Sequence, residues 1–182
     1  AVPRNLTIQR EKSGKKVLPL TVDTDGIGLA DGYMLGDATV KPDQVTITGA
    51  ESVLAQVDRA VAQTGDVDGI SEDTVLSANL VLYDANGNEL NQSQIENNLG
   101  KNGLSVSVEV LRVKSIPVVF DVTGAPAEGY KYTGCTSTPE SVQVCGKSED
   151  IDKMSEIDVP APLIDISGAS ESVEMTVDIK PY

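Results

Sequence analysis

Apolar and polar residues alternate along six short segments of this chain. Because successive side chains of a strand point to opposite faces of a sheet, each segment is predicted to be a strand with one buried face and one wet face. The alternating segments are Val45–Thr48, Ser105–Val110, Val142–Cys145 and Val173–Ile179, together with the strand starts marked by Leu18, Leu20 and Val22 and by Ile116, Val118, Phe120 and Val122.

A hairpin is predicted over Val81–Leu90. Asn86-Gly87 lies at its centre and is expected to supply the positive φ angles that a tight turn needs.

Two helices of about two turns each are predicted from apolar residues at a spacing of three to four. Ser148, followed by two acidic residues, is the expected N-cap of the second helix. The apolar positions are Val53, Leu54, Val57 and Val61 in the first helix and Ile151, Met154 and Ile157 in the second.

The pattern occurs twice. A shift of 97 residues places Gly32-Tyr33 on Gly129-Tyr130 and the strand from Val45 on the strand from Val142. Further pairs match at this shift or within two residues of it: Pro42 with Pro139, Gly49 with Gly146, Pro19 with Pro117, and Asp66–Gly69 with Asp165–Gly168. Two modules are therefore predicted, residues 13–113 and 114–182, with 1–12 as an upstream strand or linker.

The two copies differ in length. The first contains a polar stretch, Asn91–Asn98, before its last strand, whereas the second reaches Tyr182 about where that strand is expected to begin. The second copy is therefore expected to be truncated. Leu6–Gln9 is expected to be an extra strand that either belongs to an upstream copy or completes a module of this chain. The chain opens at Ala1 without an initiator Met, which is typical of an excised or processed piece.

Composition favours a mainly β fold. The chain has no Trp and a single Phe, so its core must consist mainly of Val, Ile and Leu. A net charge of −14 disfavours binding to nucleic acid and direct docking on anionic lipid. No apolar run approaches the ~20 residues of a membrane span.

Histidine is absent, which removes the commonest general base and most zinc sites. Only two cysteines are present, and they are not arranged as C-x-x-C. We therefore expect no enzyme activity, and we predict no catalytic, cofactor-binding or metal residues. A hydrolase with paired carboxylates is a minor alternative that two facing carboxylates in a deep pocket would favour.

Gly32-Tyr33 followed by Val40–Leu54 resembles the YbbR-like repeat, and Thr138–Ser148 resembles a second, weaker copy. The second copy has Lys147-Ser148-Glu149 where the first has Ala50-Glu51-Ser52. The resemblance implies two tandem modules of twisted, mostly antiparallel sheets, each with one short helix.

The resemblance also implies a function. Members of this family are bacterial proteins anchored by an N-terminal transmembrane helix, which is absent from these residues, and their modules lie outside the cytoplasm. They bind and regulate the membrane diadenylate cyclase that makes cyclic di-AMP, and they are not known as catalysts. The expected partner is thus that cyclase or another envelope protein. The alternative is an envelope spacer, or an adhesion-like or glycan-binding array.

Several short motifs have both a structural and a functional interpretation. Tyr33 and Tyr130 are either turn-flanking packed residues, which we favour, or a repeated contact surface. Asp84-x-Asn86-x-Asn88-Glu89 has the alternating oxygen ligands of a calcium loop, but it lacks the loop's Gly and final Glu, so a hairpin turn is favoured. The acidic turns at Asp23-x-Asp25-Gly26 and Asp66-x-Asp68-Gly69 offer at most a weak cation site.

Cys135 and Cys145 form either a disulfide or two free thiols, with neither state favoured by the sequence. Asn5-Leu6-Thr7 and Asn91-Gln92-Ser93 match the glycosylation sequon, which has little meaning in a bacterial protein.

Overall fold

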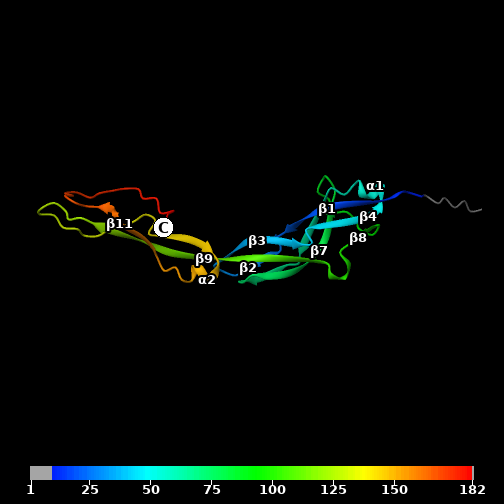
Figure 1. The fold of residues 1–182 in the computed structure, drawn as a ribbon, viewed down its shortest axis with the longest axis horizontal. Helices are drawn as coiled ribbons and strands as arrows, with labels where there is room; N and C mark the ends of the chain where they lie inside the picture. Colours follow the sequence, from blue (N-terminus) through cyan, green and yellow to red (C-terminus); the bar gives the residue numbers. More distant parts are fainter. Residues whose placement is uncertain (1–9, 182) are drawn as a thin grey trace, which may run out of the picture. The chain divides into compact units, whose positions relative to one another are not determined.

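The computed structural model describes residues 10–181, which form two compact units. Unit 1 ends at Val110 and unit 2 begins at Leu111. Leu6–Gln9 and Asn5-Leu6-Thr7 lie outside the described residues. Most described residues are in strands, which confirms the mainly β fold (Figure 1).

Unit 1 contains eight strands, the first part of a ninth, and one turn each of α and 3-10 helix. Their bounds are β1 (Ser13–Asp23), β2 (Ile27–Leu29), β3 (Tyr33–Lys41), β4 (Gln44–Ala50), α1 (Glu51–Leu54), β5 (Arg59–Thr64), β6 (Val67–Ile70), β7 (Thr74–Tyr83), β8 (Ile95–Asn97), η1 (Gly100–Asn102) and β9 (Leu104–Thr123). Unit 2 contains the rest of β9, then β10 (Ser141–Gly146), α2 (Ser148–Ile151) and β11 (Ile157–Asp165).

The sheet of unit 1 is organised around β1, which changes partner along its length. Ser13–Pro19 pairs antiparallel with β4, and Leu20–Asp23 pairs parallel with β5. Beyond these pairs the sheet continues from β5 to β7 and then β9, and from β4 to β8. β3 also pairs with β9, and β2 pairs with β6 in a separate small parallel sheet.

The strands predicted from alternation in unit 1 bury the expected face. Val45 and Ile47 of β4 are fully buried, and Leu104, Val106, Val108 and Val110 of β9 are buried at every second position. These side chains share one core with Leu18, Leu20 and Leu82. The alternation of the sequence therefore correctly identified the core face of both strands.

Unit 2 repeats the central arrangement on a smaller scale. Arg112–Pro117 of β9 pairs antiparallel with β10, and Val118–Thr123 pairs parallel with β11. Its core contains the buried Ile116, Ile157 and Val159, with Val118, Phe120, Val142 and Val144 partly buried against them.

A proline stands at each change of partner. Pro19 is the last residue of β1 paired with β4, and Pro117 is the last residue of β9 paired with β10. Proline has no N–H to donate to a ladder, so it is best tolerated where pairing with one neighbour ends. The residue after each proline donates its N–H to the residue that comes just before the antiparallel partner strand. Leu20 donates to the Asp43 carbonyl, and Val118 donates to the Glu140 carbonyl.

Both helices are shorter than predicted. α1 ends at Leu54 and α2 at Ile151, so each is one turn and not two. The residues assigned to a second turn lie elsewhere, Val61 in β5 and Ile157 in β11, because strand pairing with β1 and β9 prevails over weak helical spacing.

The predicted helix cap at Ser148 is also wrong. Lys147 is the N-cap residue, with no side-chain capping hydrogen bond, and Ser148 is the first helical residue.

A lysine stabilises the residues after each helix. The Lys16 ammonium donates to the carbonyl oxygens of Val57 and, at 3.5 Å, Leu54. The Lys114 ammonium donates to the Met154 carbonyl oxygen at 2.6 Å. Carbonyls at a helix end have no partner within the helix, and a cation there is electrostatically favourable. Lys16 and Lys114 hold matching positions in the two units.

The predicted strand over Val173–Ile179 is absent from the structure. Val173 and Met175 are exposed, and Val177 and Ile179 only partly cover the core of unit 2. This segment has the alternation of a strand, but within residues 10–181 it pairs with no strand, and alternation alone does not satisfy backbone donors.

No helix among residues 10–181 has the length and apolar character needed to cross a membrane. The module boundary expected at 113/114 remains a prediction; the two compact units divide between Val110 and Leu111, within β9.

We predict that Lys16→Met destabilises the chain by roughly 1–2 kcal/mol, because hydrogen bonds from a charged donor contribute on this order. Methionine keeps the aliphatic stem and removes only the ammonium. Urea unfolding followed by circular dichroism measures the change. Lys15→Met, on the exposed neighbouring residue, is the control and is expected to have little effect. Equal stability of the two variants would contradict the role of Lys16.

Candidate functional site

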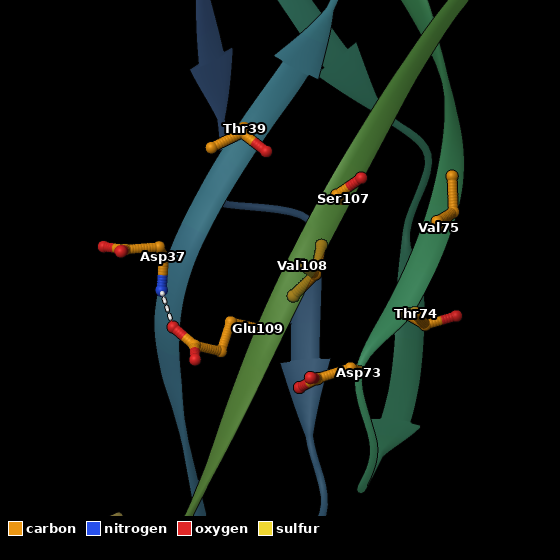
Figure 2. Close-up of a pocket in the computed structure, with 8 residues that line it drawn as sticks. All are labelled: Asp37, Thr39, Asp73, Thr74, Val75, Ser107, Val108 and Glu109. Atoms are coloured by element: carbon orange, nitrogen blue, oxygen red, sulfur yellow. Dashed lines mark hydrogen bonds between the residues drawn. The ribbon is translucent and has the colours of Figure 1, made fainter. Parts of the chain in front are cut away.

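A groove of about 440 Å³ lies on unit 1 where β3, β9 and the start of β7 meet. Figure 2 shows its lining side chains, which come from three segments distant in the sequence. They are Asp37 and Thr39 from β3, Asp73, Thr74 and Val75 from β7 and the residue before it, and Ser107, Val108 and Glu109 from β9.

Strand alternation sets the character of the groove. On β9, Val106 and Val108 face the core, so Ser107 and Glu109 face the other way and remain partly exposed. On β3, Val40 is buried, whereas Asp37 and Thr39 are exposed on the opposite face. Polar side chains therefore gather beside the exposed Val75, which is 65% accessible.

Two carboxylates of the groove accept backbone hydrogen bonds. The Asp37 N–H donates to Glu109 Oε2 at 3.4 Å, the contact drawn as a dashed line in Figure 2. The Val110 N–H donates to Asp73 Oδ1 at 2.8 Å. The β7–β9 ladder ends at the pair of Thr74 and Val108, so the backbone N–H of the buried Val110 has no partner on β7. The Asp73 carboxylate accepts this N–H instead.

The lining residues include three carboxylates and three hydroxyl groups but no basic side chain. This arrangement attracts a cationic group such as a Lys or Arg side chain. Within residues 10–181 no cluster of three or more Cys, Asp or Glu side chains is arranged to hold a metal ion.

The sequence did not identify Asp37, Asp73 and Glu109 as a group. Each is an ordinary outward-facing acid in its own segment, and the three are 36 or more positions apart along the chain, from 37 to 73 to 109. Only the pairing of β3 and β7 with β9 brings them together, and alternation within a single strand does not reveal which strands are neighbours.

The turn at Asp84 is closed by its own hydrogen bonds. Asp84 Oδ1 accepts the N–H groups of Asn86 and Asn88, both at 2.8 Å, and Oδ2 accepts from the Asn88 side chain at 3.0 Å. Hydrogen bonds from the side chain and then the backbone of Asn88 lower the pKa of Asp84 below its usual value. The carboxylate is thus engaged in the turn, as the hairpin interpretation predicts.

The hairpin itself differs in detail from the prediction. Gly87 has a φ of 84°, but no non-glycine residue among those described has a positive φ, so Asn86 does not share this role. The returning chain forms a single bridge, between Tyr83 and Glu89, together with hydrogen bonds from Asp84 N–H to the Asn88 carbonyl and from Leu90 N–H to the Leu82 carbonyl.

The other acidic turns follow the same principle. Asp23 Oδ1 accepts the Asp25 N–H at 3.1 Å, and Asp165 Oδ1 accepts the N–H and hydroxyl of Ser167. The Ser167 side chain, and then its backbone, lowers the pKa of Asp165. Asp66, just before β6, and Asp68, within β6, are both exposed.

The two tyrosines have different environments. Gly32 and Gly129 both adopt positive φ, 82° and 86°, so both are turn glycines as expected. Tyr33 packs against the core of unit 1, whereas Tyr130 is 58% exposed. The packed interpretation therefore holds for Tyr33 and is wrong for Tyr130.

Cys135 and Cys145 are both exposed free thiols in the structure. At the second sequon, Asn91 Oδ1 accepts the Ser93 N–H at 2.8 Å.

Comparison with known proteins gives consistent matches. The family model described as YbbR-like protein matches residues 18–99 and 116–182. A curated relative, the CdaA regulatory protein CdaR of Bacillus subtilis (strain 168), is 24% identical over 179 residues, covering 97% of this chain. The chain spans 35% of the length of that relative.

Among solved structures, a YbbR-like protein from Streptococcus pneumoniae TIGR4 matches with a TM-score of 0.45 and 18% identity. The match covers 55% of this chain and 48% of that chain.

We predict that Asp84→Ala lowers the urea midpoint at pH 7 and that the difference shrinks in acid. The depressed folded pKa means that the carboxylate stabilises the fold above its unfolded pKa of about 3.9, and that this contribution is lost as the pH falls through the folded pKa. Unfolding at pH 7, 4 and 2.5 measures the trend. Asp25→Ala, in the turn closed by Asp23, is the control. A difference independent of pH would contradict the electrostatic origin.

Proposed function

The chain belongs to the YbbR-like protein family, and from this premise we propose that it is a non-catalytic, extracytoplasmic interaction module of a membrane-anchored regulator of diadenylate cyclase. The partner is the membrane cyclase that makes cyclic di-AMP. A segment that is not among these 182 residues anchors the protein to the membrane.

The observation that carries this proposal is the extent of the similarity to the CdaA regulatory protein CdaR. The alignment covers 97% of the chain and therefore includes both units, including the connection through β9. A shared fold in one unit alone would carry much less information, because a fold hosts many functions.

We further propose that the chain consists of two related modules, residues 13–113 and 114–182. The order strand, strand, one-turn helix, strand recurs as β1, β4, α1 and β5 and as β9, β10, α2 and β11. The partner change at proline and the lysine after the helix recur with it. The two separate family matches support the same division.

The mechanism of regulation is a biased equilibrium and not a chemical step. A protein that binds one conformation of the cyclase more tightly than another shifts the enzyme toward that conformation, by no more than the difference in binding free energy. The groove at Asp37, Asp73 and Glu109 suits this role, because it is open, acidic and bordered by the exposed Val75. A cationic segment of the partner is its complement.

The whole proposal is tested by co-expressing the polypeptide that carries this chain with a membrane diadenylate cyclase. Cellular cyclic di-AMP is measured with the chain present and with residues 13–182 deleted behind the same anchor. We expect the nucleotide level to change and the cyclase to co-purify only when the chain is present. Unchanged cyclic di-AMP together with absent co-purification would refute the function.

The groove is tested separately by charge reversal. We predict that Asp37→Lys combined with Val75→Lys weakens binding to the detergent-solubilised cyclase by about tenfold or more, because like charges oppose one another across the interface. Val17→Lys combined with Asp31→Lys is the matched control, since Val17 is similarly exposed at 59% and lies outside the groove. Equal loss in both double variants would exclude the groove as the contact surface.

A further inference from the structure

In unit 1, the second half of β1 has one edge that no strand covers. β4 pairs with the first half of β1, and Leu20–Asp23 pairs with β5 on the opposite edge. The Leu20 N–H donates to the Asp43 carbonyl, on the side that β4 occupies. Because the backbone groups of successive residues point to opposite sides of a strand, the N–H and carbonyl of Val22 point to this same side. Within residues 10–181, no strand pairs with Val22 there.

An open groove of about 430 Å³ lies beside this free edge, with β3 as its other wall. Within unit 1 the strands are paired in the order β3, β9, β7, β5 and β1, so the groove separates the two ends of this series. Clefts that hold ligands have volumes of ~300–1,000 Å³. The groove is therefore large enough to hold a short segment of another molecule.

The groove reaches from the surface to the core between the two strand edges. Its inner wall is apolar: Leu20 and Val40 are buried in the core of unit 1, and Val22 and Ala38 pack against that core. Its outer wall includes the exposed hydroxyl side chains of Thr21 and Thr39. An occupant that fits both walls has apolar groups on one side and polar groups on the other, which is the alternation of a strand.

The polar rim of the groove is acidic. Asp43 lines it, and Thr39 lines both this groove and the groove at Asp37, Asp73 and Glu109. The two grooves are therefore continuous along β3. Among the described residues, no basic side chain lines either groove. Lys or Arg residues on the polar side of an occupant would complement this rim.

We propose that the free edge of β1 at Val22 binds an extended segment of a partner protein as an added strand. The segment has aliphatic residues at every second position, which pack against Ala38 and Val40, with Lys or Arg residues between them. A polypeptide is the class of ligand that fits, because its N–H and carbonyl groups have the spacing of a strand edge. The choice of a protein partner rests on the proposed function, whereas the binding of an added strand is tested apart from it.

The test uses the capped peptide Lys-Val-Lys-Val-Lys-Val-Lys and the isotope-labelled 182-residue chain. Titration followed by NMR is expected to give saturable shifts of the amide signals of Leu20–Asp23 and Ala38–Val40. The matched peptide with Glu in place of each Lys is expected to bind at least about tenfold more weakly, because like charges oppose one another. No binding of the Lys peptide, shifts confined to other residues, or equal binding of both peptides would overturn the proposal.

A substitution tests the edge itself. Val22→Pro removes the N–H that points into the groove and keeps those of Thr21 and Asp23, which point toward β5. We expect it to weaken binding of the Lys peptide by about tenfold or more, since a strand edge binds through its backbone groups. Val17→Pro is the control, because Val17 is exposed on the same strand and its N–H points away from β4 by the same alternation. Equal affinity of the two variants would overturn the proposal.

A change in the peptide gives the same test without any substitution in the protein. The Lys peptide is made with N-methyl groups on all of its Val residues, and separately on all of its Lys residues. We expect at least one of the two methylated peptides to bind about tenfold more weakly, because a methylated nitrogen cannot donate to a strand edge. Full binding of both methylated peptides would overturn the proposal. None of these measurements involves cyclic di-AMP, so the proposed function stands or falls separately.

Discussion

The fold depends on one constraint, which is that every backbone N–H and carbonyl of a long strand must find a partner along its whole length. β1, and the part of β9 in unit 2, meet this constraint by pairing with two different strands in succession, antiparallel at first and then parallel. The exchange occurs at Pro19 and Pro117, where a missing donor costs least. The one-turn helices follow from this arrangement, because each connects the antiparallel partner to the parallel one within a few residues.

The same constraint explains the polar chemistry of the surface. Short acidic side chains close turns and strand ends by accepting backbone N–H groups, as Asp84 does in its hairpin and Asp73 does for Val110. Lys16 and Lys114, in contrast, donate hydrogen bonds to backbone carbonyls that follow each helix. Several acidic side chains thus have a structural role, and two of them, Asp73 and Glu109, line the groove.

Residues 173–179 show that alternation in the sequence does not by itself make a strand. Residues 173–179 have a cleaner alternation than β7, yet β7 is a strand and they are not. The difference lies in the neighbour: β7 is flanked by β5 and β9, whereas residues 173–179 pair with no strand among the described residues. Exposed Val173 and Met175 are the result.

The sequence by itself determined the local features: the alternating strands of β4, β9 and β10, their buried faces, the turn glycines at 32, 87 and 129, and the family. These depend on side-chain period and on conformational preference, which act over a few residues. Only the tertiary structure decided the one-turn length of α1 and α2, the exposure of Tyr130, the absence of a strand over residues 173–179 and the placement of Asp37, Asp73 and Glu109 around one groove. Each of these depends on which strands are neighbours. Hydrogen bonds between strands join residues that are far apart along the chain, and no periodic pattern in the sequence shows which residues are joined.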